Sequence, residues 1–421
     1  MNAHPDALVV IGLGYVGLPL AVAAAARGYR TVGLDTNAAV VERLNAGRSH
    51  VDDISDAQLA EALGNGFRAT TDATAIASAA TVVICVPTPL DEHQAPDLDA
   101  VRAAAAATAS HLTLGALVVL ESTTYPGTTD GPVREILETS GLVAGREFAL
   151  AFSPERIDPG NHTYTLTNTP KVVGGYTTAC GDRAEAFYGR IVDEVVRTAG
   201  CREAELAKLL ENTYRHVNIA LVNEMAVFSH ELGIDLWDAI RAASSKPFGF
   251  EAFYPGPGVG GHCIPIDPNY LSYQVRRLGY PFRFVELAQE VSGRMPAYVV
   301  ARAQSMLNGV SKSVRGSTIT VLGLTYKANV ADERETPARP IIRRLLDLGA
   351  KVVAVDPYVR TFDVDGVVLD VAADADEACA RCDLALVLQG HRQFDLDAVA
   401  RRAALVLDTR GSMSGANVER L

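Results

Sequence analysis

The sequence predicts an α/β protein in which two doubly wound, Rossmann-like domains are joined by a long central helix. A strand, a glycine-rich turn and a helix follow one another near the N-terminus, a long helical run lies in the middle, and strand–helix alternation restarts near residue 317. With 421 residues the chain exceeds what one hydrophobic core usually supports, so several domains are expected.

The first element is an apolar strand, Leu8–Ile11, followed by Gly12–Gly17 in the pattern G-x-G-x-x-G and by an alanine-rich helical stretch. A second strand, Thr31–Leu34, ends at Asp35. This order of strand, turn, helix, strand and acid is typical of a dinucleotide-binding fold. We therefore expect a nicotinamide cofactor at this turn.

Each position of the turn has a physical role in such a site. Gly12 permits the tight turn, Gly14 lets the pyrophosphate approach the backbone, and Gly17 lets helix and strand pack closely. Asp35 accepts from the ribose hydroxyls and repels a 2′-phosphate, which favours NAD over NADP. The cofactor-binding residues predicted here are Gly12, Gly14, Tyr15, Val16, Gly17 and Asp35.

Further strands lead into polar loops, with helix and strand alternating to about residue 197. The predicted strands are Thr81–Val86, Ala116–Leu120 and Phe148–Phe152. Ligands of open α/β sheets bind at the loops that follow strand ends. Thr88 and Thr123, which lie in two of these loops, are therefore candidates for a pocket.

The middle of the chain predicts one long helix. No Gly or Pro occurs from Glu203 to Leu232, and Gly233 supplies a stop. About 30 helical residues span roughly 45 Å, a length that bridges domains or forms a subunit interface. Lys208 and Asn212 lie four residues apart on one face, and a solvent-exposed polar stripe is the simpler interpretation of that pair taken alone.

Gly260–Asp267, which reads G-G-H-C-I-P-I-D, places the thiol of Cys263 four residues before a carboxylate. A glycine-loosened turn with this content suits a nucleophile with an adjacent base. Beside a hydride acceptor, a thiol indicates oxidation through a thiohemiacetal and a thioester. A small buried apolar residue is an equally good interpretation of Cys263 from the local sequence.

The last third of the chain predicts a second α/β domain without a full glycine fingerprint, so we expect it to bind a different nucleotide or a sugar nucleotide. Lys327 and Arg334 are its candidate anion ligands, or else surface residues. Its predicted elements are the strands Thr318–Leu322, Lys351–Val355, Leu384–Leu388 and Ala404–Leu407 and the helix Thr336–Leu348.

Composition limits the partners. The formal net charge of −12 argues against nucleic acid or an anionic membrane surface. The uncharged run Leu8–Ala26 predicts neither a membrane span nor a signal peptide, because its glycines have fingerprint spacing and no basic segment precedes it. The scattered cysteines favour a reducing cytoplasm. Cys379 and Cys382 form C-x-x-C without a second ligand pair, so no metal is expected.

Seven segments, in this order, resemble the UDP-glucose/GDP-mannose dehydrogenase family over nearly the whole chain. They are Gly12–Gly17, Val86–Pro89, Glu121–Thr123, Ser153–Arg156, Lys208 with Glu211–Tyr214, Gly260–Asp267, and Lys327 with Arg334. The resemblance implies an NAD-binding domain at residues 1–197. It also implies a central helical dimerisation domain with the cysteine loop at 198–300, a UDP-sugar-binding domain at 301–421, and a homodimer or higher homo-oligomer.

The resemblance also implies an NAD-dependent four-electron oxidation of a sugar C6 alcohol to a carboxylate. Cys263 would be the nucleophile, and Asp267 would help to activate a water as base. Lys208 and Asn212 would stabilise the oxyanions. Glu155 would activate the hydrolytic water. The implied catalytic residues are Cys263, Lys208, Asn212, Asp267, Glu155 and Thr123, the last of which positions a water.

Two binding sites are implied as well. Thr88, Thr123 and Arg334 would line the cofactor. A basic residue that often follows the ribose acid by five positions is Val40 here, which leaves Arg43 or no residue for that contact. The implied substrate-binding residues are Glu155, Arg156, Lys208, Asn212, Phe253, Tyr254, Gly256, Gly260 and Lys327.

Three segments, Glu155–Asn161, Lys246–Phe250 and Gly261–Pro268, resemble the branch that oxidises UDP-N-acetylglucosamine. The UDP-glucose branch typically differs where this chain has Arg156 and Ile266. The UDP-N-acetylmannosamine branch shares the arginine but usually lacks the K-P-F-G-F run. We therefore expect UDP-N-acetylglucosamine as substrate, with UDP-N-acetylmannosamine or UDP-glucose as alternatives, and expect Arg156 to help to select the N-acetyl group.

Two other classes of function remain open. A hydroxyacid-type dehydrogenase performs one two-electron step and needs no thiol, so it releases one NADH per substrate where the thiol route releases two. A non-catalytic sugar-nucleotide-binding protein would lack one of Cys263, Lys208 or Asp267, and all three are present.

Overall fold

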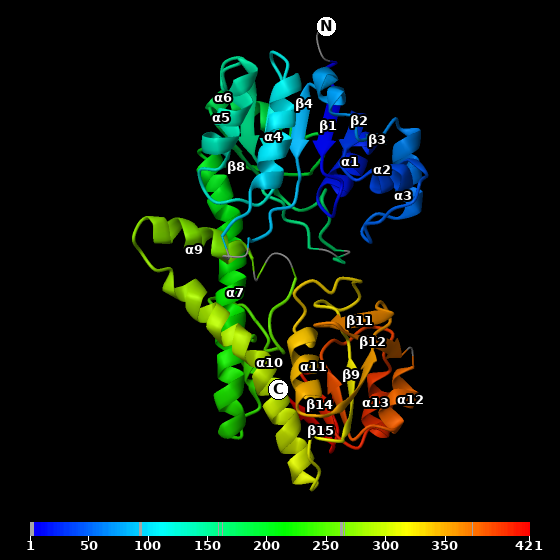
Figure 1. Ribbon diagram of the computed structural model, residues 1–421. Helices are drawn as coiled ribbons and strands as arrows, with labels where there is room; N and C mark the ends of the chain where they lie inside the picture. Colours follow the sequence, from blue (N-terminus) through cyan, green and yellow to red (C-terminus); the bar gives the residue numbers. More distant parts are fainter. Residues whose placement is uncertain are drawn as a thin grey trace. The chain divides into compact units, whose positions relative to one another are not determined.

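A computed structural model describes residues 4–91, 95–158, 160, 161, 163–261, 264, 266–372 and 374–421 (Figure 1). The chain forms two compact units. The first consists of Met1–Glu211 and Asn269–Tyr280, and the second of Asn212–Pro268 and Pro281–Leu421. Helix α7 (Cys201–Glu231) confirms the predicted long helix and runs through the boundary at residue 211. The three-domain division at residues 197 and 300 stays a prediction.

The first unit contains an eight-stranded sheet with the order β3-β2-β1-β4-β5-β6-β7-β8, the doubly wound order of dinucleotide-binding folds extended at one edge. Neighbouring strands are parallel except β6 and β7. The five strands predicted in this region are present, although β4 ends two residues before Val86. The strands are β1 (Ala7–Ile11), β2 (Arg30–Leu34), β3 (Arg68–Thr70), β4 (Thr81–Ile84), β5 (Leu117–Leu120), β6 (Ala149–Phe152), β7 (Lys171–Gly175) and β8 (Val195–Arg197).

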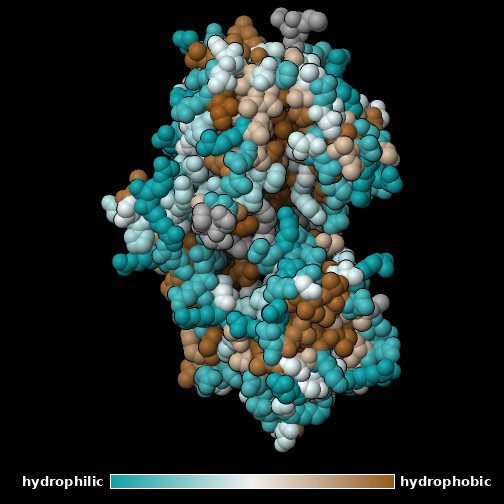
Figure 2. All heavy atoms as spheres, viewed as in Figure 1, coloured by the Kyte–Doolittle hydropathy of each residue, from teal (hydrophilic) through white to brown (hydrophobic). Residues whose placement is uncertain are grey.

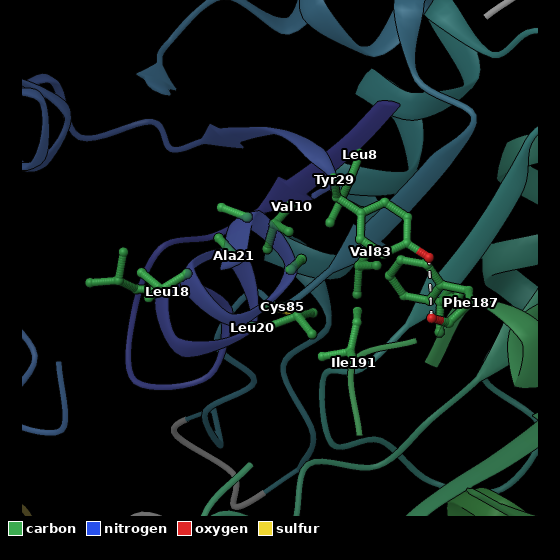
Figure 3. Packing of buried hydrophobic residues seen from close by; sticks show 14 of the residues in the cluster. Leu8, Val10, Leu18, Leu20, Ala21, Tyr29, Val83, Cys85, Phe187 and Ile191 are labelled. Carbon is green, nitrogen blue, oxygen red and sulfur yellow. Dashed lines mark hydrogen bonds between the residues drawn. The ribbon is translucent and has the colours of Figure 1, made fainter. Parts of the chain in front are cut away.

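Both faces of this sheet are covered, because every residue of β4, β5 and β6 is buried. Figure 3 shows the core, in which Leu18 of α1 and Val10 of β1 are fully buried. Tyr29 closes one side, with its hydroxyl donating to the carbonyl of Phe187 at 3.3 Å. The longer helices of the unit are α1 (Gly17–Ala26), α2 (Ala38–Asn45), α3 (Asp56–Gly64), α4 (Asp99–His111), α6 (Thr178–Tyr188) and most of α9 (Asp267–Arg277), and a short helix α5 (Arg134–Leu137) lies among them.

The second unit contains a seven-stranded sheet with the order β11-β12-β10-β9-β13-β14-β15, parallel except for the hairpin β11–β12. The four predicted strands correspond to β9, β10, β13 and β14. The hairpin was not predicted, although Asp365-Gly366, with φ of 51° and 88°, is a typical two-residue hairpin turn. The strands are β9 (Thr318–Leu322), β10 (Lys351–Val355), β11 (Thr361–Val364), β12 (Val367–Ala372), β13 (Leu384–Val387), β14 (Val406–Asp408) and β15 (Val418–Arg420).

A second long helix, α10, has 27 residues and contains Pro296. The helices of this unit, beside its part of α7, are α8 (Leu236–Ala243), α10 (Arg283–Gly309), α11 (Ala338–Asp347), α12 (Ala375–Ala380) and α13 (Leu396–Arg402). Figure 2 shows hydrophilic residues over much of the face in view, with the hydrophobic ones gathered in patches. None of the helices in the described part of the chain is long and apolar enough to cross a membrane.

Candidate functional site

The glycine turn between β1 and α1 has the geometry that its spacing predicts. Gly12 has φ of +89°, and a Cβ there would lie 2.7 Å from the carbonyl oxygen of Cys85. A Cβ on Gly17 would overlap the carbonyl oxygen of Gly12, whereas one on Gly14 would meet nothing within 4 Å. Gly12 and Gly17 are therefore required by packing, and Gly14 leaves open space beside the turn.

The carboxylate of Asp35, at the end of β2, closes this turn. Its Oδ2 accepts from the backbone N–H of Leu13 and its Oδ1 from that of Asn37, each at 2.9 Å. Each oxygen keeps a lone pair that can accept from a ribose hydroxyl. The N-terminus of α1 has no side-chain cap at Val16, which leaves it suited to a pyrophosphate. The open space at Gly14, this helix end and the carboxylate fit NAD. Arg43, which the sequence left as a possible basic contact in place of Val40, donates to the carbonyl of Ser49.

The second unit repeats this turn after β9. Gly323 has φ of +85°, and a Cβ there would lie 2.5 Å from Cβ of Gln389. Asp356, at the end of β10, accepts from the backbone N–H groups of Leu324 at 2.6 Å and Tyr358 at 2.7 Å, as Asp35 does from Leu13 and Asn37. The chain therefore uses one turn geometry twice.

The two aspartates differ in what faces them. The backbone N–H of Asn329 donates to Nδ1 of His391, so Nε2 carries the proton and donates to Asp356 Oδ2 at 3.1 Å. Burial alone would raise the pKa of Asp356, but the hydrogen bonds from His391, Leu324 and Tyr358 hold it below its usual range. Asp356 is 4% exposed. A carboxylate enclosed in this way does not serve a ribose, in agreement with the prediction that this domain binds a different nucleotide.

The segment that leads to the predicted nucleophile packs against the loop after β9. A Cβ on Gly260 would lie 2.7 Å from the carbonyl oxygen of Glu335, and one on Gly261 would lie 2.7 Å from the ring of Tyr326. The N–H of Gly261 donates to the carbonyl of Arg334 at 3.0 Å. This segment is thereby joined to the loop that carries Lys327. Cys263 lies outside the described residues.

Lys327 is half-buried in that loop. Arg334 holds both carboxylate oxygens of Asp332, with Nε at 3.0 Å from Oδ1 and Nη2 at 2.6 Å from Oδ2. The guanidinium is 49% exposed. Arg334 is therefore a surface residue whose charge is already shared with a carboxylate, and its role at the cofactor stays a prediction.

Arg410 is a cation that the sequence pattern did not single out. Its Nη1 would lie 3.0 Å from a Cβ on Gly256, whose own N–H donates to Asn223 at 2.9 Å. Burial lowers the pKa of Arg410 to about 10, and its Nε donates to the carbonyl of Leu388. A guanidinium against a glycine of the predicted substrate loop is a further candidate for binding an anion. No local motif marks this arginine.

The aromatic residues of that loop have neighbours on helices. Phe253 meets Tyr214 of α7 edge to face at a centroid distance of 5.7 Å. Tyr254 stacks on Trp237 of α8 at 5.5 Å and is 51% exposed. The loop is thus held against two helices of the second unit.

Asn212 and Asp267 form a buried polar pair in the second unit. The amide nitrogen of Asn212 donates to Asp267 Oδ2, and the two residues are 5% and 2% exposed. Asp267 is the first residue of α9, where a helix N-terminus favours negative charge. The structure therefore brings together two predicted catalytic residues that are 55 positions apart.

The predicted residues of the first unit are mostly buried. Lys208 is 8% exposed, so the interpretation of Lys208 and Asn212 as a solvated stripe was wrong: tertiary packing covers that face of α7. Glu155 is 8% exposed, and its Oε1 accepts from the N–H of Ile157. Arg156 is 2.7 Å from Glu211 and donates to the carbonyl of Pro170.

The two predicted threonines lie where strands end. Thr88 is 4% exposed, and its carbonyl accepts from the hydroxyl of Tyr270 on α9. Thr123 is half-buried in the loop after β5. Because Thr88 is buried and Thr123 is half-buried, both side chains lie where the effective dielectric constant is low.

Glu205 fastens the loop beyond Thr123 to the first turn of α7. It is fully buried and accepts from the N–H of Gly127 at 2.6 Å and from the N–H and hydroxyl of Thr129 at 2.9 and 2.7 Å. Burial raises the pKa of Glu205 to about 7, against these hydrogen bonds, which lower it. The sequence pattern did not distinguish this glutamate from Glu203, which is exposed.

Within the described residues no group of three or more His, Cys, Asp or Glu is placed to hold an ion. Cys379 and Cys382 are both buried, and the thiol of Cys382 donates to the carbonyl of Cys379. This pair packs in the core of the second unit.

A dinucleotide turn in one Rossmann-like unit and a second, enclosed turn in another are typical of a dinucleotide-binding protein with a separate nucleotide domain. Family models agree. The UDP-glucose/GDP-mannose dehydrogenase family matches with its NAD binding domain at residues 6–192, its central domain at 202–293 and its UDP binding domain at 320–415. The chain belongs to this family, and its cofactor is NAD.

Individual relatives differ in their sugar. The chain is 34% identical to an NDP-N-acetyl-D-galactosaminuronic acid dehydrogenase of Ralstonia nicotianae, over 97% of this chain and 96% of that protein. It is 35% identical to a UDP-N-acetyl-D-glucosamine 6-dehydrogenase of Pseudomonas aeruginosa, over 85% and 84%. The solved UDP-N-acetylmannosamine dehydrogenase of Pyrococcus horikoshii superposes with a TM-score of 0.89 at 31% identity, covering 98% of each chain.

Two glycine substitutions separate cofactor contact from packing. Gly14→Ala should leave the thermal midpoint within about 2 °C, because its Cβ meets nothing within 4 Å. It should nevertheless weaken NAD binding at least about tenfold, or ~1.4 kcal/mol. Gly17→Ala should lower the midpoint as well, because its Cβ overlaps the Gly12 carbonyl. Calorimetric NAD titration and thermal unfolding measure both, and wild-type affinity in Gly14→Ala would contradict a pyrophosphate at this turn.

The buried Glu205 makes stability depend on pH. Its pKa is raised in the folded state from 4.5 to about 7, so its contribution is complete below pH 4.5 and is lost as pH rises through about 7. The loss amounts to about 3 kcal/mol. Glu205→Gln should therefore flatten the fall in denaturant midpoint between pH 5 and 8. Glu203→Gln, in the same helical turn but exposed, is the control. Parallel pH dependences of wild type and Glu205→Gln would contradict this.

Proposed function

We propose that this chain oxidises the C6 alcohol of a UDP-N-acetylhexosamine to the carboxylate, through a thioester on Cys263, and that UDP-N-acetylglucosamine is its substrate. The observation that carries the proposal is the buried pair of Asn212 and Asp267. Asp267 is the first residue of α9 and follows Cys263 by four positions. A fixed carboxylate and an amide donor are the groups that proton removal and oxyanion stabilisation require.

The first oxidation needs a base for the C6 hydroxyl and donors for the alkoxide. Asp267, oriented by Asn212, takes the hydroxyl proton through a water. Lys208 and Asn212 stabilise the negative oxygen, and the buried setting of both strengthens that interaction. NAD accepts the hydride in each of the two oxidations, so two NADH form per sugar.

The second oxidation needs a carbon that still bears a hydrogen. The sulfur of Cys263 adds to the aldehyde carbon, and the thiol proton passes to the carbonyl oxygen to give a thiohemiacetal. The thiohemiacetal then loses its hydroxyl proton to Asp267 through a water and a hydride to the nicotinamide, which leaves a thioester. Water then attacks the thioester carbonyl, and Glu155 takes the proton from that water. The carbon–sulfur bond breaks, and the sulfur leaves as thiolate. Thr123 positions the water.

The expected sugar follows from the sequence segments and from the relatives. Each of the three relatives described above is named for an N-acetylated hexosamine. Arg156 is held by Glu211 and Pro170, and a guanidinium has five N–H donors, so donors remain for the acetamido carbonyl. Lys327 and the loop 253–260 would hold the nucleotide. A single-step dehydrogenase would need neither Cys263 nor Glu155.

We also propose a homodimer formed through α7. Helical spacing places a row of exposed apolar side chains on one face of this helix. Exposure of this kind is typical of an interaction site. The row consists of Leu206, Leu210, Tyr214, Leu221 and Phe228, followed by Leu232 just past the end of the helix, and these residues are 43% to 67% exposed.

The reaction is tested by product stoichiometry. Wild type should release two NADH for each UDP-N-acetylglucosamine and prefer it to UDP-glucose, UDP-N-acetylgalactosamine and UDP-N-acetylmannosamine. Cys263→Ala should still bind NAD but form no uronic acid, because no thiohemiacetal arises. Cys382→Ala, a buried thiol of the second unit, is the control. NADH absorbance gives the stoichiometry, and mass analysis of the sugar shows whether uronic acid has formed. One NADH per substrate, or acid from Cys263→Ala at the wild-type rate, would contradict the covalent route.

The dimer is tested with charges on the apolar row. Leu221→Asp with Phe228→Asp should weaken self-association at least about a hundredfold, because two carboxylates would be buried in the interface. Val368→Asp changes an apolar residue on β12 that is 62% exposed and should leave association intact. Sedimentation velocity measures the assembly, and an unaltered oligomer in the double variant would show that α7 is not the interface.

A further inference from the structure

Lys171 is a buried cation between two glutamates in the first unit. It is the first residue of β7 and is 3% exposed. Its Nζ lies 2.7 Å from Oε1 of Glu121 and 3.6 Å from Oε2 of Glu155. Burial alone would lower the pKa of Lys171, but the two carboxylates raise it, so the side chain stays an ammonium.

The two glutamates are not equally satisfied. Glu121, at the end of β5, also accepts from the hydroxyl of Tyr188 at 2.6 Å and from the thiol of Cys85 at 3.5 Å. Glu155 accepts from the N–H of Ile157 on Oε1 only. Its Oε2 is buried and has no hydrogen-bond partner among the described residues, since 3.6 Å exceeds a hydrogen bond.

The charges of this cluster define its chemistry. Burial and the neighbouring Glu121 raise the pKa values of Cys85 and Tyr188 well above their usual range, so both stay neutral. The charged groups that face Lys171 are then Glu121 and Glu155. One ammonium with two carboxylates carries one negative charge, and it becomes neutral when Glu155 takes a proton. Because Glu121 shares the ammonium of Lys171, the negative charge of Glu155 is offset but Glu155 can still accept a proton.

We propose that Lys171 is a positioning residue for thioester hydrolysis, which holds Glu155 as a carboxylate with one oxygen directed to the attacking water. The inference rests on the proposed role of Glu155. Without the ammonium, two carboxylates in one buried site cannot both stay charged, and one of them takes up a proton. A protonated Glu155 accepts no proton from water, so hydrolysis slows while both oxidations continue.

The test uses rapid mixing of the holoenzyme with UDP-N-acetylglucosamine. NADH absorbance follows the oxidations, and intact-protein mass spectrometry follows the acyl group on the enzyme. Lys171→Met should release two NADH in a burst, accumulate the acyl-enzyme and hydrolyse it roughly 100-fold more slowly. The acid limb of hydrolysis should move up by at least about one pH unit. Lys171→Arg, which keeps the cation, should restore hydrolysis to within about tenfold of wild type.

Tyr188→Phe is the matched control, because it removes another hydrogen bond to Glu121 and leaves the ammonium in place. It should lower the thermal midpoint without altering hydrolysis or its pH profile. If it reproduces the defect of Lys171→Met, the role of Lys171 is only structural and the proposal falls. Unchanged hydrolysis in Lys171→Met would also overturn it.

If Lys171→Met does not fold, Lys171→Gln keeps a long polar side chain without the charge and carries the same expectation, because both carboxylates again lack the ammonium. Wild-type hydrolysis in that variant would refute the proposal. Glu155→Gln tests the proposed role of Glu155 separately from that of Lys171. It should accumulate the acyl-enzyme at every pH. If it does not, Glu155 is not the base, and the inference about Lys171 fails with that part of the proposed function. If Glu155→Gln accumulates the acyl-enzyme but Lys171→Met hydrolyses it at the wild-type rate, only the inference about Lys171 fails and the proposed function is retained.

Discussion

The arrangement of the first unit depends on a steric constraint between two glycines. Gly17 lies so close to the carbonyl oxygen of Gly12 that no side chain fits between them, and a Cβ on Gly12 would lie 2.7 Å from the carbonyl oxygen of Cys85. Because β1 has to turn into α1 within this space, the helix begins against the carboxyl edge of the sheet. The strand order β1-β4-β5 then places the cofactor turn beside the loop that carries Thr88, and the loop that begins at Glu121 follows the next strand.

The second unit shows how one backbone geometry serves two purposes. Gly323 and Asp356 reproduce the turn of Gly12 and Asp35, including the hydrogen bonds to the carboxylate. The difference lies in one side chain, His391, which donates to Asp356 and accepts from the loop after β9. In the first unit the carboxylate stays available to a ligand, whereas in the second it organises a loop. The turn is therefore a structural unit in its own right, and cofactor binding depends on what is left open around it.

Much of the fold could be predicted because local patterns determine it. Glycine spacing and apolar runs marked the turn and the longer strands, and the absence of Gly and Pro marked α7. Lys208 shows the limit of such patterns. Helical spacing says which residues share a face, but not what covers it. Lys171, Glu121 and Tyr188 are far apart in sequence and meet only through the order of strands. The turn Asp365-Gly366 was readable in the sequence and was missed.

Buried carboxylates connect the fold to the proposed chemistry. Glu205 has hydrogen-bond donors on both oxygens, which tie the loop beyond Thr123 to α7. Glu121 likewise has partners on both of its oxygens. Glu155 differs, because its Oε2 has no hydrogen-bond partner among the described residues. A buried polar atom without a partner costs about 1–3 kcal/mol. Among these three carboxylates, Glu155 is the one with an oxygen that bears this cost. That atom belongs to the residue that we propose takes the proton of the attacking water.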